Sequence, residues 1–257
     1  MVNPSLLEYV GRQAANGIIR EHRTRETMPG KEWVRESRFG RWFLTTDIWM
    51  EYVLREAVVD LKQLLNTSLT ETRQILDIGC HQGMAFELLE EHFHPKKIIG
   101  VEIDREQIGL ALETAKRCRC HVECMQGTVY NLDLPDNSID LIFCHQLLHH
   151  LSDQASGLDE LYRVLVPGGI ILIGESCRSF LDLFWVRIFF RHPKQIQKTA
   201  QEFIELVQSR GFQIRDADIK PSTPWWSRLD LGLIEKIGIP QKPQEPTEVL
   251  MIARKPV

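Results

Sequence analysis

The sequence predicts an α/β fold in which helices cover both faces of a doubly wound, mostly parallel sheet. From residue 74 onward, short apolar runs alternate with stretches of helical periodicity, which is the pattern of consecutive βαβ units. The first apolar run, at residues 75–78, is broken by Gly79 and Gly83 and is followed by a helical pattern. A strand that ends in a glycine turn and a helix leaves backbone N–H groups facing a crevice, where a ligand can bind.

Length and composition are those of an ordinary globular protein. The 257 residues are 43% hydrophobic and 26% charged, and the net charge of −4 argues against a general nucleic-acid binder. The first residues do not resemble a signal peptide, and no apolar run reaches the roughly 18 residues that span a bilayer. The six cysteines are scattered in a way that fits reduced thiols. We therefore expect a cytoplasmic protein without a transmembrane segment.

Residues 1–70 lack the strand–helix alternation, and we expect them to form a helical lid or substrate segment on a main domain of residues 71–257. Apolar residues at positions 7, 10, 14 and 18 suit one amphipathic helix, and a second is expected over 47–65. Residues 1–42 hold eight basic and five acidic side chains, interleaved with aromatic ones. That mixture also suits binding to nucleic acid or to an anionic substrate, but we favour a lid whose aromatic side chains pack on the main domain.

Six further strands and three helices are expected after the first turn. The strands are expected at 97–103, 122–125, 139–143, 170–173, 212–219 and 248–253. Asp104 caps the first helix, a second covers about 155–165, and Pro193 opens a third that Gly211 ends. We expect residues 177–195 and 220–246 to be insertions on the substrate side. The apolar run at 180–190 is interpreted as a helix over the mouth of the active site, with weak membrane-surface contact as the alternative.

The glycine turn, QILDIGCHQG at 74–83, fits one nucleotide-binding pattern better than another. A dinucleotide fingerprint counted from Gly79 requires glycine at 81 and 84, where the chain has His81 and Met84. An acid followed by three alternating glycines fits Asp77, Gly79 and Gly83, and only His81 departs from it. At the end of its strand, Asp77 is placed to accept hydrogen bonds from a cationic amine.

Four ordered segments together resemble the class I S-adenosylmethionine-dependent methyltransferases, in particular their type-11 small-molecule branch. The turn is similar to motif I of that family, and three later runs match its other segments: LPDNSIDLIF at 134–143, FCHQLLHHL at 143–151 and LYRVLVPGG at 161–169. The resemblance covers residues 74–175. It implies a Rossmann-like sheet of seven strands with the last strand antiparallel, S-adenosyl-L-methionine as the cofactor, and a methyltransferase activity.

The resemblance, with the strand-tip positions, predicts the residues that bind the cofactor. Glu102 ends the second strand, where an acid can accept both hydroxyls of a ribose. His81 stands where the family has glycine, and Thr128 where it commonly has aspartate, so these two positions put the affinity for the cofactor in question. The full predicted set is Asp77, Gly79, Cys80, His81, Gly83, Glu102, Ile103, Thr128, Val129 and Cys144.

The predicted catalytic residues are His145, His149 and Tyr130. A general base is needed only if the acceptor arrives protonated, and His145, just past the fourth strand, is the first choice for contact with the substrate or cofactor. His149 and His150 are alternatively packing residues. A metal on His145 and His149, or on the cysteines near residue 120, does not fit the expected geometry, and no metal site is predicted.

The acceptor is predicted to be small and aromatic or lipophilic, because Trp42, Trp185 and Trp226 fall in the three segments expected around the cleft. An RNA or protein methyltransferase is one alternative, and a non-catalytic partner protein that binds the cofactor is another. A nicotinamide-dependent oxidoreductase is disfavoured by the failed fingerprint. We expect a monomer or a homodimer.

Overall fold

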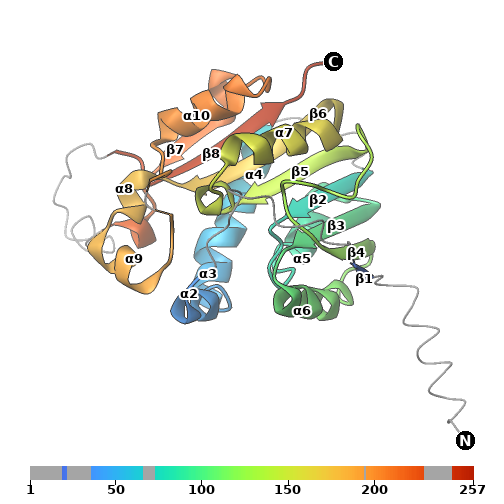
Figure 1. Cartoon of the computed structure of the whole chain (residues 1–257), viewed down its shortest axis with the longest axis horizontal. Helices are drawn as coiled ribbons and strands as arrows, with labels where there is room; N and C mark the ends of the chain where they lie inside the picture. The colour runs from blue at the N-terminus through green and yellow to red at the C-terminus, as the bar shows by residue number, and fades with distance from the viewer. Residues whose placement is uncertain (1–18, 22–35, 66–72, 194, 229–244) are drawn as a thin grey trace, which may run out of the picture.

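One mixed sheet organises the part of the chain that the structure describes. The computed structural model describes residues 19–21, 36–65, 73–193, 195–228 and 245–257. Within these residues the sheet has eight strands in the order β1-β4-β3-β2-β5-β6-β8-β7 (Figure 1). The strands are β1 (Ile19–Glu21), β2 (Gln74–Ile78), β3 (Lys97–Glu102), β4 (His121–Gln126), β5 (Ile139–His145), β6 (Leu165–Ser176), β7 (Ile219–Ser222) and β8 (Glu248–Arg254).

The seven predicted strands are all present, and β8 is the antiparallel one. It pairs antiparallel with β6 and with β7, whereas the pairs from β4 through β6 are parallel. The eighth strand, β1, pairs parallel with β4 through Ile19 and Cys124. The helical prediction for residues 1–70 is therefore wrong at Ile19–Glu21, because these residues complete a sheet edge. The helix predicted around residues 7–18 lies outside the described residues.

Two predicted element positions are wrong, each for a local reason. The strand predicted at 212–219 begins only at Ile219, because residues Asp216–Asp218 form a short 3₁₀ turn (η3) that Asp218 anchors to Arg215 and Arg254. The helix predicted to open at Pro193 is α10 (Ala200–Ser209). It starts late because Thr199 and Glu202 form a reciprocal capping box at its N-terminus.

Helices cover both faces of the sheet and bury two separate apolar layers. Helices α7 (Gln154–Val164) and α10 lie on one face, and α4 (Glu56–Leu65), α5 (Phe86–Phe93) and α6 (Arg105–Ala115) lie on the other (Figure 1). Leu161 and Phe203 are fully buried in the first layer, and Leu61 and Phe86 in the second. Burial of such side chains contributes roughly 1.5–3 kcal/mol each, which fixes the sheet between the two layers.

Five short helices lie at the carboxyl ends of the central strands. They are α2 (Arg38–Phe43), α3 (Asp47–Trp49), the π-helical turn η1 (Met50–Arg55), α8 (Arg178–Leu181) and α9 (Phe184–Phe189). Figure 1 shows α2 and α3 close to one another and α8 and α9 at the same end of the molecule. The single helix predicted over 180–190 is divided at Asp182 and Leu183. No helix among the described residues is long and apolar enough to cross a membrane.

Candidate active site

The strand order reverses between β2 and β5, and a large cavity opens at that switch point. It has a volume of about 580 Å³, within the range of small-molecule sites. In open α/β sheets, ligands bind outside the carboxyl ends of the strands where the order reverses. Of the predicted site residues, all but Gly83 and Cys144 line this cavity.

The turn after β2 is held against β3 by its own backbone. The N–H groups of Gly79 and Cys80 both donate to the carbonyl of Val101, at 2.8 and 3.1 Å. Gly83 has a φ of +73°, and a Cβ on it would lie 2.4 Å from the Phe86 ring. Gly83 therefore shapes the turn without lining the cavity, and its contact with the cofactor stays a prediction.

The buried side chain of Asp77 has one carboxylate oxygen that lacks a hydrogen-bond partner among the described residues. The side chain is 3% exposed, and its Oδ2 has no hydrogen-bond partner within the described parts of the chain. Burial, reinforced by the charge of Glu102, raises the pKa of Asp77 to about 8. An orphaned buried carboxylate is costly unless a cation pairs with it, so this oxygen fits the amine of an amino-acid ligand.

Glu102 is fixed at the tip of β3 by three backbone N–H groups. Its Oε1 accepts from Ile103 and Asp104 at 2.8 and 2.9 Å, and its Oε2 accepts from His81 at 3.0 Å. Burial raises the pKa of Glu102, against the lowering effect of these bonds. Because each carboxylate oxygen has further lone pairs, Glu102 retains capacity for hydroxyl donors in the cavity.

His81 contributes its backbone to the site while its ring is enclosed. The residue has a φ of +49°, which directs its N–H to Glu102. Both ring nitrogens are buried without partners in the described structure, and burial lowers the pKa of His81 to about 4. A neutral ring therefore lines the pocket in the position where the family has glycine.

The residues predicted to lie near the adenine line the cavity, whereas Cys144 does not. Ile103, Thr128 and Val129 line the cavity. Cys144 is fully buried between β2 and β6 and lies away from the cavity lining, and burial raises its thiol pKa well above the usual value. Successive side chains of a strand point to opposite faces, which separates Cys144 from the cavity-lining Phe143 and His145, and its contact with the cofactor stays a prediction.

Aromatic side chains form most of the wall opposite the strand tips. Trp185 and Trp226 line the cavity, as predicted, and so does Trp49. Trp42 does not, since it is 59% exposed on the outer side of α2. The aromatic residues on the cavity side are Phe39, Phe43, Trp49, Tyr130, Phe143, Phe180, Trp185, Phe189, Phe190, Trp225 and Trp226.

Two segments far apart in the sequence meet at the wall of the cavity. The Glu36 carboxylate accepts from the backbone N–H of Arg191 at 2.8 Å, and the Ser37 hydroxyl donates to the carbonyl of Phe189. The Phe39 ring contacts the rings of Phe189 and Phe190, with centroids 4.8 and 5.6 Å away. These contacts connect α2 to the end of α9 beside the cavity.

His145, the last residue of β5, lines the cavity with an uncharged ring. Burial, reinforced by His149, lowers the pKa of His145 to about 3. Its ring stacks on Phe143 at 5.6 Å, and Gly174 leaves room for it, since a Cβ there would lie 2.8 Å from the ring. A base works best with a pKa near the working pH, so His145 is better suited to contact and shape than to proton removal.

His149 is held by a buried carboxylate that the sequence prediction missed. Its Nδ1 lies 2.6 Å from Oε2 of Glu175, which is fully buried at the end of β6. Glu175 also accepts from the N–H groups of Leu147 and Leu148, at 2.9 and 2.7 Å, and so fixes the 3₁₀ turn η2 (Leu148–His150). The rule that identified Glu102, an acid at the tip of a parallel strand, would also have found Glu175.

Tyr130 lines the same cavity, and its hydroxyl accepts from the backbone N–H of Asp153 at 3.3 Å. The three predicted catalytic residues, His145, His149 and Tyr130, are thus brought together around one chamber.

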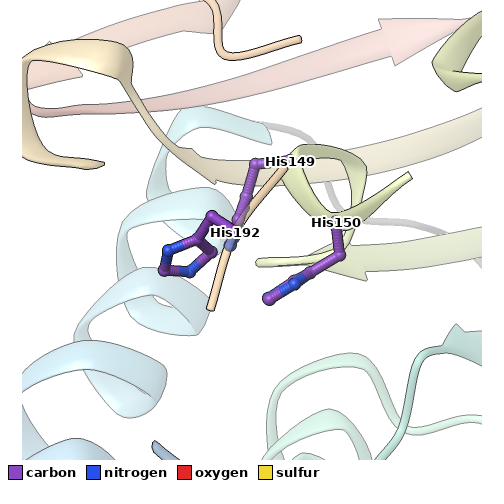
Figure 2. A group of neighbouring side chains, drawn as sticks. All are labelled: His149, His150 and His192. Atoms are coloured by element: carbon purple, nitrogen blue, oxygen red, sulfur yellow. The ribbon is translucent and has the colours of Figure 1, made fainter. Parts of the chain in front are cut away.

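His150 and His192 complete a group of three histidines with His149. Figure 2 shows His149 and His150 projecting from the same turn and His192 approaching from the segment after α9. One ring nitrogen of each lies within 4.8 Å of those of the other two. Burial, reinforced by His149, lowers the pKa of His192 to about 3, so this ring is neutral. Sequence spacing did not reveal the group, because His192 is distant in the chain.

Comparison with known proteins gives consistent results for the central part of the chain. A family model described as a methyltransferase domain matches residues 76–173. An S-adenosylmethionine-dependent methyltransferase of Mycolicibacterium smegmatis is 29% identical over 145 residues, which is 56% of this chain and 53% of that protein. Phosphoethanolamine N-methyltransferase 1 of Arabidopsis thaliana is 28% identical over 144 residues, which is 56% of this chain and 26% of that protein.

The chain thus spans about half the length of the first relative and about a quarter of the second. A solved S-adenosylmethionine-dependent methyltransferase from Mesorhizobium loti superposes with a TM-score of 0.58 at 18% identity, covering 77% of this chain and 96% of that one. At this identity the likeness concerns the fold alone.

Proposed function

We propose that the chain is a class I S-adenosylmethionine-dependent methyltransferase that transfers a methyl group to a small aromatic or lipophilic acceptor. The observation that carries the proposal is that the two sides of one cavity differ in their chemistry. Buried carboxylates lie at the strand tips, and aromatic rings line the opposite wall.

The strand-tip side of the cavity fits the cofactor. Asp77 would accept the amine through its orphaned oxygen, and Glu102 would accept the ribose hydroxyls. Ile103, Thr128 and Val129 would contact the adenine. S-adenosylmethionine supplies a methyl group already activated on a sulfonium, so the protein has mainly to align the acceptor and exclude water.

The aromatic side of the cavity suits the acceptor. Trp49, Trp185 and Trp226 offer large apolar surfaces that bind a planar or lipophilic molecule, and an apolar wall gives little affinity for a phosphate backbone. An RNA acceptor, which depends on phosphate contacts, is therefore the weaker reading. An acceptor that arrives protonated would lose its proton to His149, whose Nδ1 is occupied by Glu175 and whose Nε2 remains as acceptor.

Other parts of the proposal concern domain organisation and setting. We assign residues 1–70 to a lid over the domain of residues 71–257, and residues 177–195 and 220–246 to the substrate side. The contacts of Glu36 and Ser37 with the segment at 189–191 support this arrangement. We also assign the protein to the cytoplasm, as a monomer or homodimer. All six cysteines lie in the described residues and are free thiols.

Calorimetric titration with S-adenosylhomocysteine tests the cofactor side. We expect the wild type to bind in the micromolar range and Glu102→Ala to bind at least about tenfold more weakly, because charge-assisted hydrogen bonds contribute roughly 1.5–3 kcal/mol. Glu113→Ala, an exposed acid on α6, is the control and should bind like the wild type. Absent binding in the wild type, or equal binding in Glu102→Ala, would overturn the assignment and favour a non-catalytic role.

A further inference from the structure

The three histidines at the rim of the acceptor chamber have the composition and spacing of a metal site. His149, His150 and His192 all line the cavity, and their donor nitrogens lie within 4.8 Å of one another. In a tetrahedral site with bonds of roughly 2.1 Å, ligand atoms lie about 3.4 Å apart. The difference is at most about 1.4 Å, and rotations of the His150 and His192 rings about their side-chain bonds would close it.

His149 is already oriented as a metal ligand would be. Its Nδ1 lies 2.6 Å from the buried carboxylate of Glu175, which leaves Nε2 as the ring nitrogen available to a metal ion. Metal-binding histidines usually donate their second nitrogen to a carboxylate in this way, which fixes the tautomer and strengthens the ligand. Hydrogen bonds from Gln154 and Gln197 to the carbonyls of Leu148 and His149 hold the turn rigid.

A second carboxylate lies on the opposite side of the group. Glu36 Oε2 is 3.7 Å from Nε2 of His192, and its side chain is 12% exposed. Glu175 thus lies next to His149, and Glu36 lies next to His192.

We propose that His149, His150 and His192 bind one divalent transition-metal ion of the class that prefers imidazole, with Zn²⁺ as the representative. Glu175 holds His149 in position, and Glu36 supplies charge next to His192. The site goes beyond methyl transfer and does not depend on it, because metal binding can be measured without cofactor or acceptor. A metal ion and a proton compete for Nε2 of His149, so each excludes the other.

Equilibrium dialysis against Zn²⁺, with metal analysis of the protein, tests the site. The parent for all measurements carries Cys118→Ser and Cys120→Ser, which removes two partly exposed thiols that also bind zinc. We expect one Zn²⁺ per chain in this parent, and affinity at least about tenfold weaker in His192→Ala and in His150→Ala. His145→Ala removes a histidine from the same cavity but from outside the group, and should retain the ion.

Two results would overturn the proposal. One is the absence of stoichiometric Zn²⁺ in the parent, and the other is unchanged affinity in both His192→Ala and His150→Ala. Thermal unfolding with and without Zn²⁺ separates loss of the site from loss of the fold, because an ion that binds only the native state raises Tm. His192→Gln, which keeps the side-chain volume, replaces His192→Ala if the latter does not fold. Mg²⁺, which prefers oxygen ligands, should not raise Tm.

Discussion

The proposed contact of Asp77 with an ammonium group would give the site a dependence on pH that a surface carboxylate would not give. Its pKa of about 8 means that the ligand-free protein keeps this acid protonated at neutral pH. A bound ammonium group requires the ionised form, so binding must expel a proton from Asp77. The free energy of binding is therefore linked to pH through this one residue.

We predict that the affinity for S-adenosylhomocysteine rises with pH between about 6 and 7.5, by up to tenfold per pH unit. The sign follows from the raised pKa, because proton release is favoured as the pH approaches 8. Calorimetry in buffers of different ionisation enthalpy should register close to one proton released per ligand. Asp77→Asn should bind more weakly with a flat pH dependence, and a flat wild-type profile would refute the role of Asp77.

Sequence alone located the residues whose position follows from the strand pattern. Asp77 and Glu102 stand at strand tips, and parallel strands bring their tips to one edge. Cys144 does not line the cavity, and the alternation along β5 could have separated it from Phe143 and His145, which do. Glu36 and His192 could not be found, because their meeting depends on how two irregular segments pack.

At the scale of elements, the turn between β2 and α5 depends on Gly83. Its φ of +73° is unfavourable for any side chain, and a Cβ would lie 2.4 Å from Phe86, which is fully buried. The turn carries the backbone of Gly79 and His81, so strain at Gly83 is transmitted to the cofactor side of the cavity.

We predict that Gly83→Ala lowers the free energy of unfolding by about 2–4 kcal/mol, from backbone strain and overpacking together. Gly109→Ala is the matched control, since Gly109 lies inside α6 with no atom within 4 Å of the added Cβ. That substitution should stabilise by roughly 0.5–1 kcal/mol. Urea denaturation measures both, and a Gly83→Ala protein as stable as the wild type would contradict the strain argument.

The existence of the elements was easier to predict from sequence than their limits. The apolar runs of β2, β3, β5 and β8 specify buried strands, and all four were predicted within two residues of their observed ends. The start of α10 depends instead on the reciprocal bonds of Thr199 and Glu202, and the start of β7 depends on Asp218. Side chains that compete for backbone groups in this way shift an element without changing its periodicity.

At the scale of the whole molecule, Asp218 joins the η3 turn to strand β8 of the sheet. It is 1% exposed, and its carboxylate accepts from Arg215 at 2.6 and 2.8 Å and also from Arg254 on β8. Burial acts to raise the pKa of Asp218, but the hydrogen bonds and charges of the two arginines outweigh it and hold that pKa below its ordinary value. Its contribution to stability is present at neutral pH and is lost as the pH falls through the lowered pKa.

We predict that Asp218→Asn lowers the free energy of unfolding by about 1–3 kcal/mol at pH 7.5, because two arginines lose a charged acceptor. The difference from the wild type should shrink as the pH falls below about 4, where an unfolded aspartate becomes protonated. Urea denaturation at several pH values measures this. Asp216→Asn, at an exposed position of the same turn, should differ from the wild type by less than about 0.5 kcal/mol at every pH.

The position of β8 has a consequence for the order in which the molecule is made. β8 lies between β6 and β7 in the sheet, yet it follows both of them in the chain. During synthesis β6 therefore emerges with one edge unpaired, and β7 has no strand to join until β8 is translated. The nascent protein can assemble β1 through β6 early, but it must keep a groove open for a strand that arrives last and runs in the opposite direction. Until β8 enters that groove, the apolar edge of β6 is where a nascent chain most needs protection from neighbouring chains.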